Sequence, residues 1–278
     1  MEQTIYPQKE TKVMISSEKY ESADIGMTKQ AGYRIAVINS SGNTGKSLAS
    51  NYMLKPNMNL QRHYVINNLS MYSKTYSDEI VLSGRDFDEA LEALSNLDSA
   101  IVDIAAHTTE YVIDIMKNNR GSHKVFDYFL VPVIKGQKES EDSLNTIKAL
   151  LKLGVPHESI RIIFNNNHFS EVINEEFGYL LPHLDELKIP YDTDAAIENS
   201  PLYSMLSDLD ISLPELLSIP IEEKKNRQEY LRTKKITERT EEESEELQTL
   251  VNLIMTWRCA QSAVKNLNNV YQLLFTKL

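Results

Sequence analysis

Cysteine is almost missing from this sequence of 278 residues, which contains only Cys259. A single cysteine excludes an internal disulfide framework and a zinc site of the CxxC kind, and it suits a reducing compartment. Long apolar runs are missing as well: nowhere do about 18 uncharged apolar residues follow one another, and residues 1–29 are polar and charged. We therefore expect neither a secretion signal nor a transmembrane segment, and we predict a cytoplasmic protein.

Basic residues are also fewer than acidic ones. The chain has 29 Lys and Arg residues against 40 Asp and Glu residues, a formal net charge of -11. This balance argues against broad attraction to nucleic acid or anionic lipid, so we expect direct DNA binding to be weak or indirect. Glycine and proline number only 9 each, and 41% of the residues are apolar, which excludes a collagen-like or mostly disordered chain. The chain is therefore expected to fold around a sizeable core.

Strand and helix patterns alternate through the middle of the chain. Residues 1–32 show no sustained period and are predicted to form a polar N-terminal arm. Runs rich in Ile, Val, Phe and Tyr then predict buried strands at 33–39, 63–67, 99–105, 126–134 and 159–165. Helical patterns lie at 46–55, 85–96, 108–119, 139–153 and 169–181. This alternation predicts an α/β fold with a doubly wound, mainly parallel sheet of the P-loop NTPase type, over residues 33–220.

The composition changes after residue 220. Residues 221–246 are dense in charges of both signs and favour helix, and apolar residues then recur at steps of three and four. We predict a C-terminal helical appendage over residues 221–278. Its apolar stripe either packs on the nucleotide domain or forms an interface with a subunit or partner, and it consists of Leu247, Leu250, Ile254, Trp257, Val264, Leu267, Tyr271, Leu274 and Leu278.

The sharpest chemical signal is IAVINSSGNTGKS at residues 35–47, where an apolar strand meets a glycine-containing turn and then a helix. Backbone N–H groups of such a turn cradle phosphate oxygens, a lysine reaches the outer phosphates, and the next hydroxyl binds Mg²⁺. Lys46 and Ser47 occupy those last two places. The strict pattern GxxxxGK[ST] requires glycine where this chain has Ser40. The alternative is an ordinary turn in which Gly45 supplies a positive φ and Lys46 is solvated.

Two polar residues end neighbouring strand patterns. Asp103 follows the apolar run at 99–102, on the sheet edge where open α/β folds bind ligands. Its carboxylate could hold the Mg²⁺ shell or orient the attacking water, and the alternative is a helix N-cap. Asn165 could hydrogen-bond the edge of a base, and a turn asparagine is the alternative. The six histidines, at 63, 107, 123, 157, 168 and 183, show no metal-ligand spacing, so we expect surface or polar-core roles for them.

Three blocks of this sequence resemble the ParA/MinD class of ATPases. SGNTGKS at 41–47 is similar to their deviant phosphate loop KGGxGK[ST], and AIVDIA at 100–105 to their second acidic motif. A closer resemblance is to StbB-type plasmid stabilisation proteins, in AVINSSGNTGKS, IVDIAAHTTEYV and the segment from FDYFLVPVIKGQ to IRIIFNN. The likeness extends from residue 33 to about residue 167. It implies ATP and Mg²⁺ as cofactors.

The resemblance also implies roles for individual residues. Lys46 and Asp103 would be the catalytic residues, Ser47 and Asp103 would hold the metal, and Asn165 would lie near adenine. The nucleotide would be bound by Gly42, Asn43, Thr44, Gly45, Lys46, Ser47 and Asn165.

The chain departs from the family at two places. The lysine that these ATPases use across their dimer falls on Ser41, and their water-positioning aspartate is replaced by Asn67 and Asn68. An amide orients water but cannot accept its proton, so we expect slow or partner-dependent hydrolysis.

Three functions are therefore open. The first is an ATP-binding switch, a slow ATPase in plasmid stability or partition, which forms a nucleotide-dependent homodimer and acts with a DNA-binding partner protein of a plasmid stability system. The second is a non-hydrolysing nucleotide-binding scaffold, which Ser41, Asn67 and Asn68 favour. The third, a small-molecule P-loop kinase, is the least favoured because the arginines between 34 and 161 are scattered singly and form no lid.

Overall fold

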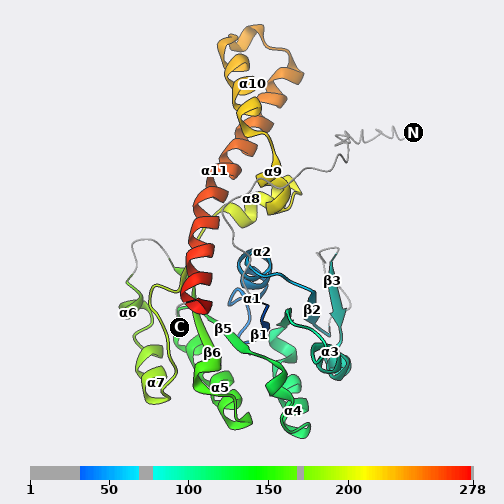
Figure 1. Ribbon diagram of the computed structural model, residues 1–278. Coiled ribbons are helices and arrows are strands. Elements are labelled where there is room, and N and C mark those ends of the chain that lie inside the picture. Colours follow the sequence, from blue (N-terminus) through cyan, green and yellow to red (C-terminus); the bar gives the residue numbers. More distant parts are fainter. Residues whose placement is uncertain (1–31, 69–77, 168–171, 277–278) are drawn as a thin grey trace, which may run out of the picture.

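The structure is a computed structural model, and it describes residues 32–68, 78–167 and 172–276. Residues 1–31 of the predicted arm at 1–32, residues 169–171 of the predicted helix at 169–181, and Leu278 lie outside the described residues. The strands are β1 (Arg34–Val37), β2 (Arg62–Ile66), β3 (Glu79–Leu82), β4 (Ala100–Ile104), β5 (Tyr128–Val133), β6 (Ile160–Asn167) and β7 (Ala196–Glu198). They form one sheet in the order β3-β2-β4-β1-β5-β6-β7, and every neighbouring pair is parallel (Figure 1).

Helices connect the strands. A continuous helical stretch follows β1 and consists of α1 (Lys46–Leu48), the π-helical η1 (Ala49–Leu54) and α2 (Lys55–Asn57). The longer helices are α3 (Phe87–Leu94), α4 (Thr109–Asn118), α5 (Gln137–Leu153), α6 (Ile173–Glu176), α7 (Leu180–Glu186), α8 (Leu202–Leu209), α9 (Leu213–Ser218), α10 (Ile221–Thr233) and α11 (Glu241–Phe275). Short 3₁₀ turns are η2 (Gly84–Asp86), η3 (Ala106–Thr108), η4 (Ser122–Val125), η5 (His157–Ser159) and η6 (Ile236–Glu238).

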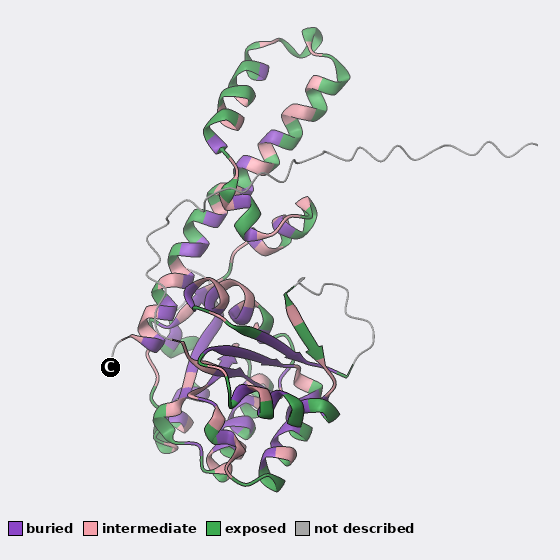
Figure 2. Ribbon diagram, turned by 45° about the vertical axis from the view of Figure 1, so that its right-hand side comes forward, coloured by how far each residue is buried: buried purple, intermediate pink, exposed green. Residues whose placement is uncertain are grey.

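The central strands are buried on both faces, which explains their unbroken apolar sequences (Figure 2). Helices α3, α4, α5 and α7 cover one face, where Val102 and Val131 lie in a large apolar core. Residues 46–57 and the end of α11 cover the other face, where Val37 and Ile101 lie. Because parallel strands are joined by helices on both faces, the predicted doubly wound fold of the P-loop NTPase type is confirmed.

The C-terminal helical appendage of that prediction is also present, as a hairpin of α10 and α11. Helix α11 is 35 residues long and begins with a capping box between Thr240 and Glu243; at 1.5 Å per residue it measures about 50 Å. Its first half packs with α10 and extends away from the sheet (Figure 1). Its last turns bury Leu267 and Tyr271 in the same core as β1 and β4. The apolar stripe therefore packs on the sheet domain at its C-terminal end.

Some elements differ from the predictions. The two edge strands β3 and β7 and the helices α8 and α9 fall outside the predicted runs; β3 leaves Ile80 and Val81 exposed, and β7 has only three residues. The single helix predicted at 169–181 is wrong, because the described residues form α6 and α7 with a break at 177–179. Gly178 weakens helix there, and Phe177 instead packs edge-on against Phe164 of β6.

Candidate functional site

A tight turn connects β1 to α1 at the carboxyl edge of the sheet. Asn43 and Gly45 both adopt a left-handed conformation, with φ of 55° and 91°. A Cβ on Gly45 would lie 2.0 Å from Nδ2 of Asn165 and would displace that amide, and the positive φ favours glycine as well. The first helical hydrogen bond follows at once, from the N–H of Ala49 to the carbonyl of Gly45. The turn therefore presents the N-terminal end of a helical stretch, as a phosphate-binding loop does.

Helix α5 holds the beginning of this loop through buried hydroxyl groups. The backbone N–H of Ser40 donates to Oγ1 of Thr146 at 3.1 Å, and Oγ of Ser40 donates to the carbonyl of Asp142 at 3.1 Å. The amide of Asn39 donates to Oγ of Ser143 at 2.8 Å. Ser40 thus fits where the strict motif has glycine, because α5 offers polar partners to its side chain. Sequence reasoning did not find this support, since residues about 100 positions apart make the contacts.

Lys46 is buried beneath the loop, with 8% of its surface exposed. Its Nζ donates to the carbonyl of Ser41 at 2.8 Å and to Oγ1 of Thr44 at 3.4 Å. Burial lowers the pKa of Lys46 to about 8, and the nearby carboxyl of Asp103 opposes that shift. A buried ammonium group whose partners are one loop carbonyl and one loop hydroxyl can exchange them for phosphate oxygens.

Asp103 lies on β4, directly opposite Val37 of β1 in the sheet register. It is 3% exposed, and burial raises its pKa to about 6. Hydrogen bonds from the Ser47 and Ser50 side chains and the charge of Lys46 favour its ionised form. The structure therefore brings Lys46, Ser47 and Asp103 together, and a carboxylate beside a helix-start hydroxyl is a donor set that suits Mg²⁺.

The predicted nucleotide-binding residues differ in their exposure to solvent. Gly42, Asn43 and Ser47 are exposed on the loop, whereas Thr44 is fully buried. Asn165 contacts the loop itself: its Nδ2 donates to the carbonyl of Thr44 at 2.9 Å. Its proximity to adenine stays a prediction.

The ends of β2, β3 and β4 meet beside the loop. Asn67 donates its backbone N–H to the carbonyl of Leu82 at 2.8 Å, and Oδ1 of Asn68 accepts from the N–H of Gly84 at 2.6 Å. The N–H of Asn68 in turn donates to Nε2 of His107 at 3.4 Å. The sequence analysis expected a surface or polar-core role for His107, and the structure places it at the surface beside Asn68.

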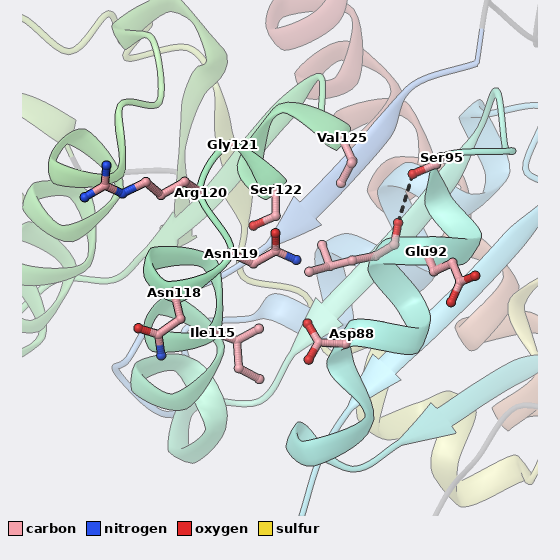
Figure 3. Close-up of a pocket in the computed structure, with 11 residues that line it drawn as sticks. Asp88, Glu92, Ser95, Ile115, Asn118, Asn119, Arg120, Gly121, Ser122 and Val125 are labelled. Atoms are coloured by element: carbon pink, nitrogen blue, oxygen red, sulfur yellow. Dashed lines mark hydrogen bonds between the residues drawn. The ribbon is translucent and has the colours of Figure 1, made fainter.

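A cavity of about 860 Å³ lies between α3 and α4, away from the loop (Figure 3). Asp88 and Glu92 of α3 line it together with Ile115 and Asn118 of α4. None of the residues that line it belongs to the predicted phosphate site. The predicted phosphate site is therefore separate from this cavity.

Comparison with known proteins gives a likeness at the level of the fold. Neither a protein-family model nor a curated protein matches the chain. Among solved structures, the Mg-ADP complex of the septum site-determining protein MinD from Pyrococcus horikoshii is 13% identical, with a TM-score of 0.44, over 80% of this chain and 94% of that one. A chain of the MinC:MinD cell division protein complex from Aquifex aeolicus is 14% identical, with a TM-score of 0.44, over 67% of this chain and 88% of that one.

A ParA family ATPase from Chlorobium tepidum is 15% identical, with a TM-score of 0.38, over 64% of this chain and 87% of that one. These likenesses concern the fold alone. Identities this low establish no shared function, so the functional argument rests on the chain's own residues. No helix in the described part of the chain is long and apolar enough to cross a membrane.

Proposed function

We propose that this protein is an ATP-binding switch of the ParA/MinD-like kind that acts in plasmid stability or partition, as StbB-type proteins do. The observation that supports nucleotide binding most directly is the buried Lys46 in a left-handed glycine turn, beside the Ser47–Asp103 contact. Loop N–H groups from Gly42 to Ser47 and the Lys46 ammonium bind the phosphates. Ser47 and Asp103 hold Mg²⁺, which neutralises charge on the outer phosphates.

Turnover by the isolated protein is slow in this proposal. Ser41 replaces the lysine that acts across the dimer in the resembled ATPases, and Asn67 and Asn68 replace their water-positioning carboxylate. These two replacements equally favour the second candidate function, a nucleotide-binding scaffold that does not hydrolyse ATP. Phosphate release under single-turnover conditions separates the two, because the scaffold retains intact ATP.

Partners follow from the same proposal. ATP binding favours a homodimer in the cytoplasm, and a DNA-binding protein of the plasmid system recognises the ATP-bound state. The resemblance of residues 33–167 to plasmid stabilisation proteins supports the plasmid role. The net charge of -11 supports an indirect link to DNA.

The central test is ATP binding by the Lys46→Ala variant. Loss of a charge-assisted contact to the phosphates should weaken Mg-ATP binding at least tenfold, or about 1.4 kcal/mol. Labelled ATP titrated into wild type and variant measures this ratio. Lys117→Ala is the matched control, because Lys117 is exposed on α4 and pairs with Asp114 of the same helix. Equal affinity of wild type and Lys46→Ala would refute the phosphate-loop assignment.

A further inference from the structure

A buried amide holds the beginning of the phosphate loop. Asn39 is fully buried just after β1, and its Oδ1 accepts the backbone N–H of Ser41 at 2.9 Å. Its Nδ2 donates to the carbonyl of Pro132 on β5 and to Oγ of Ser143 on α5, both at 2.8 Å. A carbonyl only accepts and a backbone N–H only donates, so these partners fix which way the amide faces. Because both of its donors are engaged, the amide offers Ser41 an acceptor in a fixed position.

A second buried amide holds the end of the loop. Asn165 on β6 is 7% exposed, and its Nδ2 donates to the carbonyl of Thr44 at 2.9 Å. The same nitrogen lies 2.0 Å from the place that a Cβ on Gly45 would take, so the amide fits closely against the glycine. Strands β1 and β6 lie on opposite sides of β5 in the sheet, so the two amides come to the loop from different strands.

Lys46 contacts the same two loop residues that the amides hold. Its Nζ donates to the carbonyl of Ser41 and to Oγ1 of Thr44. When the ammonium group leaves these partners for phosphate oxygens, the amides still hold the N–H of Ser41 and the carbonyl of Thr44. The backbone between them keeps its shape without the lysine, so phosphate binding does not have to order the loop.

We propose that Asn39 and Asn165 are positioning residues that clamp the phosphate loop in its binding conformation before a nucleotide arrives, an inference that rests on the proposed ATP-binding function. The clamp acts on the loop backbone and therefore on the phosphates, so its contribution does not depend on the base. Contact of Asn165 with adenine, in contrast, would favour only nucleotides that carry the matching base.

The test at the end of the loop compares Asn165→Ala with wild type in binding Mg-ATP, Mg-GTP and magnesium tripolyphosphate, which has no base. Each ligand that the wild type binds should be weakened by the same factor, on the order of tenfold. In the protein without ligand, backbone order parameters of residues 42–45 should fall below about 0.6, while those of β4 stay at about 0.85. A merely structural role would not produce a change confined to the loop.

Asn57→Ala is the matched control. Asn57 is 6% exposed, and its Nδ2 donates to the carbonyl of Met53 at 2.9 Å, so the substitution removes the same kind of buried hydrogen bond. Asn57 lies at the far end of the helical stretch that begins with Lys46. The affinities for all three ligands and the order parameters of the loop should therefore stay at their wild-type values.

The test at the beginning of the loop uses Ser143→Ala, because Asn39 itself is fully buried. This substitution removes one of the two acceptors that orient the amide of Asn39. Hydrogen exchange of the Ser41 N–H should become about tenfold faster, and the ligands should weaken by one common factor. Ser140→Ala is the control, because Ser140 is a buried serine about one turn earlier on α5.

Four outcomes overturn the clamp. They are a loss of affinity in Asn165→Ala that is confined to ATP, wild-type affinity and order parameters in that variant, a fall in its order parameters throughout the sheet, and unchanged exchange of the Ser41 N–H in Ser143→Ala. In each case the ATP-binding proposal stands as long as Lys46→Ala binds weakly. Equal ATP binding by wild type and Lys46→Ala refutes the proposed function itself.

Discussion

At the scale of single residues, Gly45 leaves little room for a side chain. An added methyl group would collide with the amide of Asn165 in a backbone conformation that side chains disfavour. We expect Gly45→Ala to lower the free energy of unfolding by about 1 to 3 kcal/mol and to weaken ATP binding, as measured by urea unfolding and nucleotide titration. Gly42→Ala is the control for stability, because nothing lies within 4 Å of its Cβ position. Equal losses in the two variants would contradict the steric argument.

The lowered pKa of Lys46 predicts that ATP binding takes up protons. Its pKa of about 8 means that about half of the molecules carry a neutral Lys46 at pH 8. Phosphate oxygens favour the ammonium form and raise this pKa, so ATP binding at pH 8 should take up as much as about half a proton per site. Asp103, with a pKa of about 6, is already ionised at that pH and adds no proton change.

Calorimetric titrations in buffers of different ionisation enthalpy measure this uptake. Lys46→Arg is the control, because an arginine is charged in both states. Proton release by the wild type at pH 8, or the same uptake by Lys46→Arg, would show that another group titrates on binding.

At the scale of elements, helix α5 supports the loop through Thr146. Replacing Thr146 with valine keeps the shape of the side chain and leaves the N–H of Ser40 without its acceptor. We expect a loss of about 1 to 3 kcal/mol in the free energy of unfolding, measured with urea. Thr249→Val on α11 is the control, because Thr249 is exposed and its hydroxyl bonds within its own helix. Equal losses in Thr146→Val and Thr249→Val would show that the contact between Thr146 and Ser40 does not stabilise the fold.

The sequence predicted most elements because the central strands are apolar on both faces and the turns carry glycine. The fold class and five of the seven strands were visible in this way. The break between α6 and α7 was not visible, since it depends on how Phe177 packs against β6. In the site, the spacing of Gly45, Lys46 and Ser47 was local and readable. The hydroxyls of α5 and the position of His107 depend on contacts between distant segments, which no local pattern encodes.

At the scale of the whole molecule, the α10–α11 hairpin is a separable extension. Arg227 and Glu246 bridge its two helices at 2.6 Å, whereas Leu267 and Tyr271 belong to the sheet core. Joining residue 226 to residue 247 through a short Gly-Ser linker removes Leu231, which is buried within the hairpin, and should leave the sheet domain folded and ATP binding unchanged. If the hairpin carries a subunit or partner interface, this variant should show a smaller association state by light scattering.

Deletion of residues 222–278 is the contrasting variant. It also removes the last turns of α11 from the sheet, where burial of each large apolar side chain contributes about 1.5 to 3 kcal/mol. We expect this protein to aggregate. A soluble, ATP-binding product would show that the sheet does not need α11.

The position of α11 in chain order also has a consequence for biosynthesis. The face of the sheet that carries Val37 and Ile101 is complete in sequence once β7 ends at Glu198, yet the part of its cover that residues 46–57 do not supply lies in the last turns of α11, as far as Phe275. At about 5 to 20 residues per second, a ribosome needs about 4 to 15 s to add the intervening residues. During that interval the nascent chain presents an uncovered apolar surface, so we expect its folding yield in translation to depend on holdase chaperones.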